Sequence, residues 1–258
     1  MVKQLFCALA NKYAGRPILV IGGGPSVTHD LPRIPDNYVG CVISANQHGF
    51  KQDRFKVDYV TCVDFTMGHS RKPMSEELGQ YGVPSISRWA WSTYRLPNAW
   101  SYSGDTGMTA IAIAAALGGH PVLFTGLDRN IGDRKYFWQG PPDDPVGWER
   151  RRHQAMKLNR PNMLQSNQKL VEMTKGAQVR TMSGPLRGIF KTWDINEKLP
   201  PFAPTTAFHT ALQTGKLYYV QAARLFLHPT DPIPQGTTLM LTDNEARAPL
   251  KDGRVRPA

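Results

Sequence analysis

The feature that most constrains the fold is the stretch from Pro17 to Ser26, which reads PILVIGGGPS. Four consecutive apolar residues, three of them β-branched, predict a strand buried on both faces, as in a parallel sheet. Gly22, Gly23 and Gly24 then allow a sharp turn and bring backbone N–H groups close to a ligand. Ser26 is placed to cap a following helix, whose N-terminus would suit a phosphate. A tight strand-to-helix turn without a ligand fits the same stretch.

The dinucleotide fingerprint G-x-G-x-x-G is not met, because Val27 stands where that motif has its third glycine. We therefore expect a Rossmann-like sheet without an NAD site.

Further buried strands are predicted downstream, at residues 38–44, 57–63, 83–87, 121–126 and 178–182. Helices are predicted at residues 1–14, 108–117 and 148–175, the last broken near Pro161. This alternation predicts an α/β fold, a Rossmann-like, doubly wound and mostly parallel sheet. Asn46, Asp64 and Asp128 each follow a strand, at the edge where open α/β sheets bind ligands.

The chain has 258 residues, a net charge of +11 and a pI near 9.7. Such a charge suits an anionic partner, either nucleic acid or a phosphorylated substrate, but no nucleic-acid motif supports the first. The three cysteines are scattered and lack zinc spacing, so we expect reduced core thiols and no metal site. No apolar run is long enough to span a bilayer, and residues 1–14 lack a signal-peptide pattern. We expect no membrane contact.

The character of the chain changes near Gly215, after an irregular, proline-rich stretch. Short strand-like segments follow at 217–220, 224–227 and 238–241, and Thr242 begins a pattern with N-cap chemistry. We predict a Rossmann-like domain over residues 1–200, a linker over 201–216 and a β module over 217–258. Because about forty residues are rarely stable alone, the module should dock on the main domain or on a partner.

Four short motifs of the main domain carry a family resemblance: GGGPS at 22–26, SANQ at 44–47, DTG at 105–107 and FTGLD at 124–128. In their order and spacing they resemble the bacterial sialyltransferases with a variant Rossmann fold, over residues 17–182. They also resemble a related uncharacterised family grouped with archaeal pterin pyrophosphokinases. The resemblance implies a cytidine nucleotide sugar as substrate.

By this resemblance, Gly23, Ser26, Asn46, Thr106 and Gly107 would hold the nucleotide. Tyr136 falls where the family has a tyrosine that contacts the phosphate. With the remaining turn glycines and the strand-end aspartate, the predicted nucleotide-binding set is Gly22, Gly23, Gly24, Ser26, Asn46, Asp64, Thr106, Gly107 and Tyr136.

The family's histidine general base is not matched, because the corresponding position lies near Asn162. An amide cannot accept the acceptor hydroxyl's proton, and general-base help is typically worth ~10²–10⁴-fold. Either His153 or Asp128 takes that catalytic role, or the chemistry has been lost. The sequence thus leaves enzymatic activity open.

The C-terminal segment resembles a short β module that ends many tailed-phage proteins, through an apolar strand, a proline-glycine turn, TLMLTDNEA at 238–246 and a closing Pro-Ala. It implies a bacteriophage virion or morphogenesis protein on a glycosyltransferase-like scaffold, docked to other virion proteins through residues 217–258. The alternative is an active soluble glycosyltransferase that uses a cytidine nucleotide sugar. We expect the protein in the virion or the host cytoplasm, with self-association left open.

Overall fold

The structure is a computed structural model and describes residues 4–5, 9–64, 73–89, 91–96, 105–128, 136–140, 144–204, 215–220, 224–228, 231–234, 238–242, 250–252 and 254–257. Within these ranges, only the backbone is described for residues 4–5, 148, 151–163 and 215–242.

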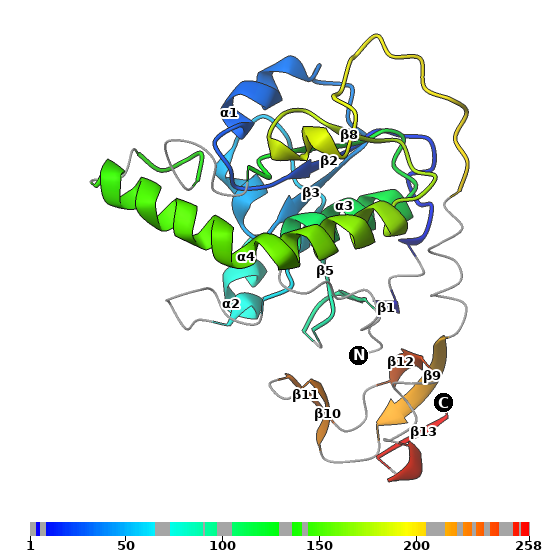
Figure 1. The fold of residues 1–258 in the computed structure, drawn as a ribbon. Helices are drawn as coiled ribbons and strands as arrows, with labels where there is room; N and C mark the ends of the chain where they lie inside the picture. Colours follow the sequence, from blue (N-terminus) through cyan, green and yellow to red (C-terminus); the bar gives the residue numbers. More distant parts are fainter. Residues whose placement is uncertain are drawn as a thin grey trace.

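A single parallel sheet organises the main part of the chain (Figure 1). Its strands are β1 (Gln4–Leu5), β2 (Ile18–Ile21), β3 (Cys41–Ala45), β4 (Tyr59–Thr61), β5 (Ser85–Ser87), β6 (Tyr94–Arg95), β7 (Val122–Thr125) and β8 (Val179–Thr181). They lie in the order β1-β6-β5-β4-β3-β2-β7-β8, and every neighbouring pair is parallel. The predicted α/β, doubly wound fold is confirmed.

The strand order reverses at β2. The chain builds β3, β4, β5 and β6 outward on one side of β2, then returns to place β7 on the other side. Connections leaving neighbouring strands in opposite directions open a crevice at the strands' carboxyl ends. The fold therefore puts its natural ligand position beside the ends of β2 and β7.

Both faces of β2 are buried, as its unbroken apolar run predicts. Ile18 and Val20 belong to one apolar cluster, whereas Leu19 and Ile21 belong to another on the opposite face. All four residues are fully buried. This central strand is the anchor from which the glycine turn leaves.

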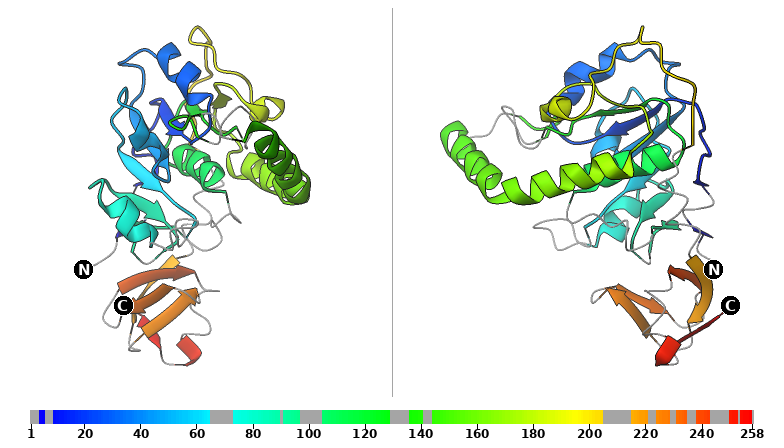
Figure 2. Two further views of the ribbon diagram at one scale, coloured as in Figure 1. Left: turned by 90° about the vertical axis from the view of Figure 1, so that its left-hand side faces the viewer. Right: turned by 45° about the vertical axis from the view of Figure 1, so that its right-hand side comes forward.

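Helix α3 (Thr106–Ala116) covers one face of the sheet and is buried over its whole length. Its small side chains let it pack against β2, β3 and β7 while α4 (Pro145–Met173) lies on its outer side (Figures 1 and 2). The short helix α1 (Val27–Asp30) follows the glycine turn, and α2 (Met74–Gly79) lies between β4 and β5. The helices set the walls of the ligand position.

Two predictions about helices are wrong. The described part of the helix predicted at residues 1–14 is not α-helical: residues 4–5 form β1, residue 9 lies in a 3₁₀ turn and residues 10–15 form turns. Asn11 and Gly15 have positive φ values of 55° and 75°, and the N–H groups of Asn11 and Tyr13 donate to the carbonyls of Ala116 and Leu117 at the end of α3. Tertiary hydrogen bonds thus override the helical periodicity.

The helix expected to break near Pro161 runs without a break from Pro145 to Met173. Proline lacks one intrahelical donor and strains the preceding turn. In a helix of eight turns that loss does not end the hydrogen-bonded run.

The C-terminal strands pair among themselves. β9 (Gly215–Val220), β12 (Thr238–Thr242) and β13 (Val255–Pro257) form an antiparallel sheet in the order β12-β9-β13. β10 (Arg224–His228) and β11 (Asp231–Pro234) form an antiparallel pair with an irregular register. These strands begin two residues before the predicted module.

Of the three cysteines, Cys41 and Cys62 are buried and free, as expected of core thiols, whereas Cys7 lies outside the described residues. Burial raises the pKa of both described thiols. Across the part of the chain that the structure describes, no helix combines the length and the apolar character needed to cross a membrane.

Candidate functional site

A cavity of about 340 Å³ lies at the carboxyl ends of β2 and β7. Eight of the nine predicted nucleotide-binding residues line it: Gly22, Gly23, Gly24, Asn46, Asp64, Thr106, Gly107 and Tyr136. Ser26 lies behind the wall and contacts Asp128, which lines the cavity. His153 lies in α4, and its side chain is outside the described residues. The structure thus brings nearly the whole predicted set together.

The glycine turn is closed against the chain that leaves β7. The N–H of Gly22 donates to the carbonyl of Thr125 (2.9 Å), and the N–H of Gly24 donates to that of Gly126 (2.8 Å). A Cβ on Gly22 would lie 2.8 Å from the carbonyl carbon of Gly126. Two of the three turn N–H groups therefore bind the protein itself, and close packing already requires glycine at Gly22.

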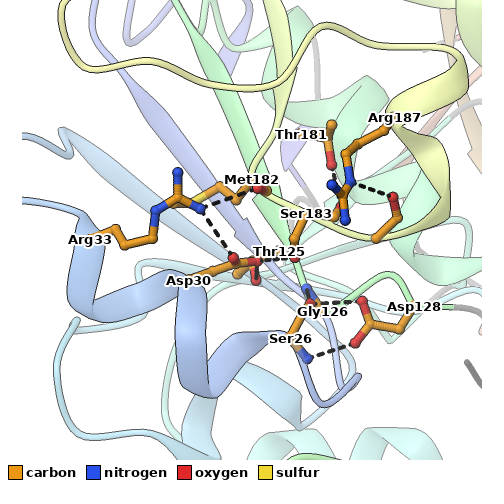
Figure 3. Close-up of polar contacts among 11 residues, drawn as sticks. Ser26, Asp30, Arg33, Thr125, Gly126, Asp128, Thr181, Met182, Ser183 and Arg187 are labelled. Atoms are coloured by element: carbon orange, nitrogen blue, oxygen red, sulfur yellow. Dashed lines mark hydrogen bonds and ion pairs between the residues drawn. The ribbon is translucent and has the colours of Figure 1, made fainter. Parts of the chain in front are cut away.

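Asp128 occupies the place where the sequence predicted a phosphate. Its carboxylate accepts the backbone N–H of Ser26 and the Ser26 hydroxyl, each at 2.7 Å (Figure 3). The Ser26 oxygen in turn accepts the N–H of Gly126. The Ser26 side chain makes no capping bond to α1, contrary to the prediction. An internal carboxylate thus fills this helix N-terminus.

The hydrogen-bonded carboxylate is a poor candidate for a general base. Both oxygens of Asp128 are engaged by Ser26. Burial raises the pKa of Asp128, and the hydrogen bonds from Ser26 oppose that shift. The geometry fits a residue that fixes the glycine turn.

A second buried carboxylate holds α1 against the sheet. Asp30 accepts hydrogen bonds from the hydroxyls of Thr125 (2.6 Å) and Ser183 (2.5 Å), and Arg33 lies 3.6 Å from it (Figure 3). Thr125 ends β7 and Ser183 follows β8, so this carboxylate joins three elements around the glycine turn.

Asn46 is held in an uncommon backbone conformation with its side chain in the cavity wall. Its φ is 54°, a left-handed value that asparagine tolerates better than most residues. Its N–H donates to the carbonyl of Thr61 (2.8 Å), and its carbonyl accepts the Ser44 hydroxyl (2.6 Å). The side-chain oxygen is buried and has no hydrogen-bond partner among the described residues. An unsatisfied buried acceptor costs about 1–3 kcal/mol, so a small rotation of the Asn46 side chain that gives this oxygen a donor would be favourable.

The N-terminus of α3 forms the opposite wall. Asp105 caps the helix by accepting the N–H of Met108 (3.1 Å), and the Thr106 hydroxyl accepts the N–H of Val63 (3.3 Å). The first N–H groups of an α-helix have no intrahelical acceptor, and the helix dipole favours an anion there. Thr106 and Gly107 place such groups at the cavity.

The remaining charges of the wall are mostly negative. Asp64, Asp105 and Asp128 are carboxylates, and His48 is the only side chain in the described lining that can become cationic. Burial raises the pKa of Asp64, with Arg88 opposing the shift and Asp105 adding to it. An anionic ligand would meet unfavourable charge on one side of the cavity and a helix N-terminus on another.

His48 was missed by sequence reasoning. It begins a 3₁₀ turn (His48–Lys51) two residues after Asn46, and its ring contacts those of Tyr136 and Trp138, with centroids 5.0 and 5.1 Å away. Tyr136 and Trp138 stack on each other at 4.7 Å. The only sequence signal for His48 was its position in the polar segment that follows β3.

The segment 136–140 contributes Tyr136 to this side of the cavity. The N–H of Phe137 donates to the carbonyl of Gly23 (2.9 Å), and the Phe137 side chain is buried in the apolar cluster that contains Leu19 and Ile21. These two contacts of Phe137 hold its neighbour Tyr136 at the cavity, next to Gly23 of the glycine turn.

Solved structures that this chain is similar to include sialyltransferases. The sialyltransferase CstII from Campylobacter jejuni, in complex with the substrate analogue cytidine-5'-monophosphate, is 12% identical with a TM-score of 0.38, over 78% of this chain and 98% of that one. A complex of the same protein with CMP-3FNeuAc is 11% identical with a TM-score of 0.37, over 77% and 98%. At these values the likeness decides neither activity nor substrate.

No protein-family model matches the chain and no curated protein matches it significantly, so no comparison supports the resemblance to tailed-phage proteins or to the pterin pyrophosphokinase-related family.

Proposed function

We propose that this chain binds a cytidine nucleotide in the cavity beside β2 and β7, as part of a nucleotide sugar used for glycosyl transfer. The observation that carries the proposal is that Asn46 lines the cavity and that its side-chain oxygen has no hydrogen-bond partner among the described residues, so a small rotation would offer it to a ligand. It suits a donor such as a ribose hydroxyl or an exocyclic amino group. The cavity's size and its position at the reversal of strand order are those of nucleotide sites in open α/β sheets.

The N-terminus of α3 supplies the second requirement. A phosphate needs hydrogen-bond donors, and two of the three N–H groups of the glycine turn already donate to backbone carbonyls of the protein. Thr106 and Gly107 offer first-turn N–H groups on the far side of the cavity, in a helix of eleven residues. Cytosine is the base that the resemblance to the sialyltransferases implies.

Ligand-induced stabilisation tests the proposal. CMP at 100 times its dissociation constant should stabilise the fold by about 2.7 kcal/mol and raise the melting temperature. UMP, AMP and GMP at the same concentration should give smaller shifts. No shift with any nucleotide at millimolar concentration contradicts the proposal.

A pair of glycine variants locates the site. In Gly23→Val the new Cβ would lie 2.8 Å from the Tyr136 ring and 2.9 Å from His48 Nδ1, so it should abolish the CMP shift. Gly140→Val is the matched control, because a Cβ there meets nothing within 4 Å. Equal CMP shifts in the two variants would place binding elsewhere.

Transfer needs its own assay. Incubation with CMP-N-acetylneuraminate and a panel of sugar acceptors should release CMP faster than in buffer alone. A chain that binds CMP without releasing it from the donor would be a binding protein on a transferase scaffold.

A place in a tailed-phage particle is a separate proposal, supported by the sequence pattern of residues 217–258. That strands β9–β13 pair with one another fits a docking module. Homo-oligomers and other virion proteins are its proposed partners.

A further inference from the structure

We propose that His48, in its protonated form, contacts the phosphate of the bound nucleotide and makes nucleotide affinity depend on pH. This inference rests on the proposed function and adds a residue that neither the motifs nor the resemblance assigns.

The position of His48 is fixed from two sides. Its imidazole lines the cavity next to Gly23, where an added Cβ would lie 2.9 Å from Nδ1. The rings of Tyr136 and Trp138 pack against it. Because these contacts hold the ring at the wall, a ligand in the cavity meets it without a rearrangement of the 3₁₀ turn.

The charges around the cavity explain why His48 would matter for binding a phosphate. Among the described residues of the lining, the titratable groups that share the cavity with His48 are Asp64, Asp105, Asp128 and Tyr136. Asp128 is engaged by Ser26, Asp105 caps α3, and Arg88 lies near Asp64.

A phosphate brings further negative charge among these carboxylates. In the described lining, positive charge can come from His48 alone. Lys51 and Asp53 lie farther along the same turn and its exit, on the wall of a different surface hollow.

Histidine ordinarily titrates near pH ~6.5, inside the range of a binding assay. A phosphate next to the ring favours the protonated form, so by linkage the protonated protein binds the phosphate more tightly. One charge-assisted contact corresponds to roughly a tenfold or larger change in affinity. Affinity for CMP should therefore rise as the pH falls.

Calorimetric titration at pH 5.5 and 8.0 tests this with CMP and with cytidine, which lacks the phosphate. The proteins are the full chain, His48→Gln and the control His29→Gln, which changes an exposed histidine outside the cavity. The phosphate of CMP itself titrates near pH ~6, but equally for all three proteins. The comparison is therefore the ratio of affinities between proteins at each pH.

The expected result is that His48→Gln weakens CMP binding roughly tenfold at pH 5.5 and much less at pH 8.0. Cytidine binding should be unchanged, and His29→Gln should match the unsubstituted chain. Equal loss at the two pH values, or equal loss for CMP and cytidine, overturns the role of His48. If the unsubstituted chain binds neither ligand, the proposed function fails, and this inference fails with it.

A measurement without a variant guards against a misfolded His48→Gln protein. In ¹H–¹⁵N spectra of the unsubstituted chain, saturating CMP should raise the pKa of one imidazole and cytidine should not. If every imidazole titrates identically with CMP and with cytidine, the inference is wrong.

Discussion

Replacing Gly22 with alanine should test how tightly the glycine turn is joined to β7. The new methyl carbon would lie 2.8 Å from the carbonyl carbon of Gly126 and closer still to its oxygen. Carbon–oxygen contacts otherwise begin near ~3.3 Å, so the two segments must separate by about 0.5 Å or more. The obstacle is backbone, which cannot turn aside as a side chain can.

The magnitude follows from the bond that this separation breaks. The N–H of Gly22 donates to the carbonyl of Thr125 at 2.9 Å, and a shift of about 0.5 Å takes the pair beyond the usual ~3.2 Å limit. A buried donor left without a partner costs about 1–3 kcal/mol, and overpacking costs a similar amount. We expect Gly22→Ala to lose about 3 kcal/mol, which lowers the melting temperature by roughly 6–12 °C in a domain of this size.

Thermal and urea denaturation, without ligand, measure the effect. Gly79→Ala is the matched control: it lies in α2, and a Cβ there meets nothing within 4 Å. The control should be neutral or stabilising by up to about 1 kcal/mol. If the two variants melt at the same temperature, the turn and β7 are not in the close contact described here.

Three further predictions concern other parts of the chain. Asp128→Asn should reduce stability by about 2 kcal/mol, since an amide cannot accept both bonds from Ser26; because burial raises the pKa of Asp128, urea denaturation should show the cost growing as the pH falls toward its ordinary value of 3.8. Glu197→Gln should destabilise the chain above pH 4.5 and progressively less on acidification, because Arg180 and Lys191 lower the pKa of Glu197 to about 2. Melting curves of the variant and the unsubstituted chain at pH 7 and pH 4 measure this difference. A chain cut to residues 1–214 should stay folded and bind CMP, but mass spectrometry should not detect it in washed phage particles. A full-length chain that never co-purifies with particles refutes the docking proposal.

Local patterns could predict the sheet because its strands are buried on both faces. The runs at Ile18–Ile21, Cys41–Ala45 and Val122–Thr125 are nearly all apolar, which is the signature of central parallel strands. The two outermost strands on one side of the sheet, β1 (Gln4–Leu5) and its neighbour β6 (Tyr94–Arg95), have two residues each and no pattern to recognise. They form only where the folded chain brings them together.

The site was predictable to the extent that strand ends determine it. Asn46 and Asp64 follow strands, so their meeting at one edge followed from the fold class. His48 belongs to no motif, and only the folded chain shows that it lines the cavity and packs against Tyr136. The carboxylate of Asp128 at Ser26 joins residues 102 positions apart, which no local pattern encodes.

The carboxylate at the glycine turn bears on how such a site could change over time. In enzymes that bind dinucleotides, the N-terminus of the helix after this turn binds the pyrophosphate of the cofactor. Here the chain supplies the anion from Asp128, and the third glycine position holds Val27, buried in the core. A related protein with a dinucleotide site at this turn would need two changes together, a glycine in place of Val27 and the loss of the Asp128 carboxylate. Either change alone would leave the turn unable to bind the pyrophosphate. Lineages with this turn are thus separated from dinucleotide enzymes by two coupled steps.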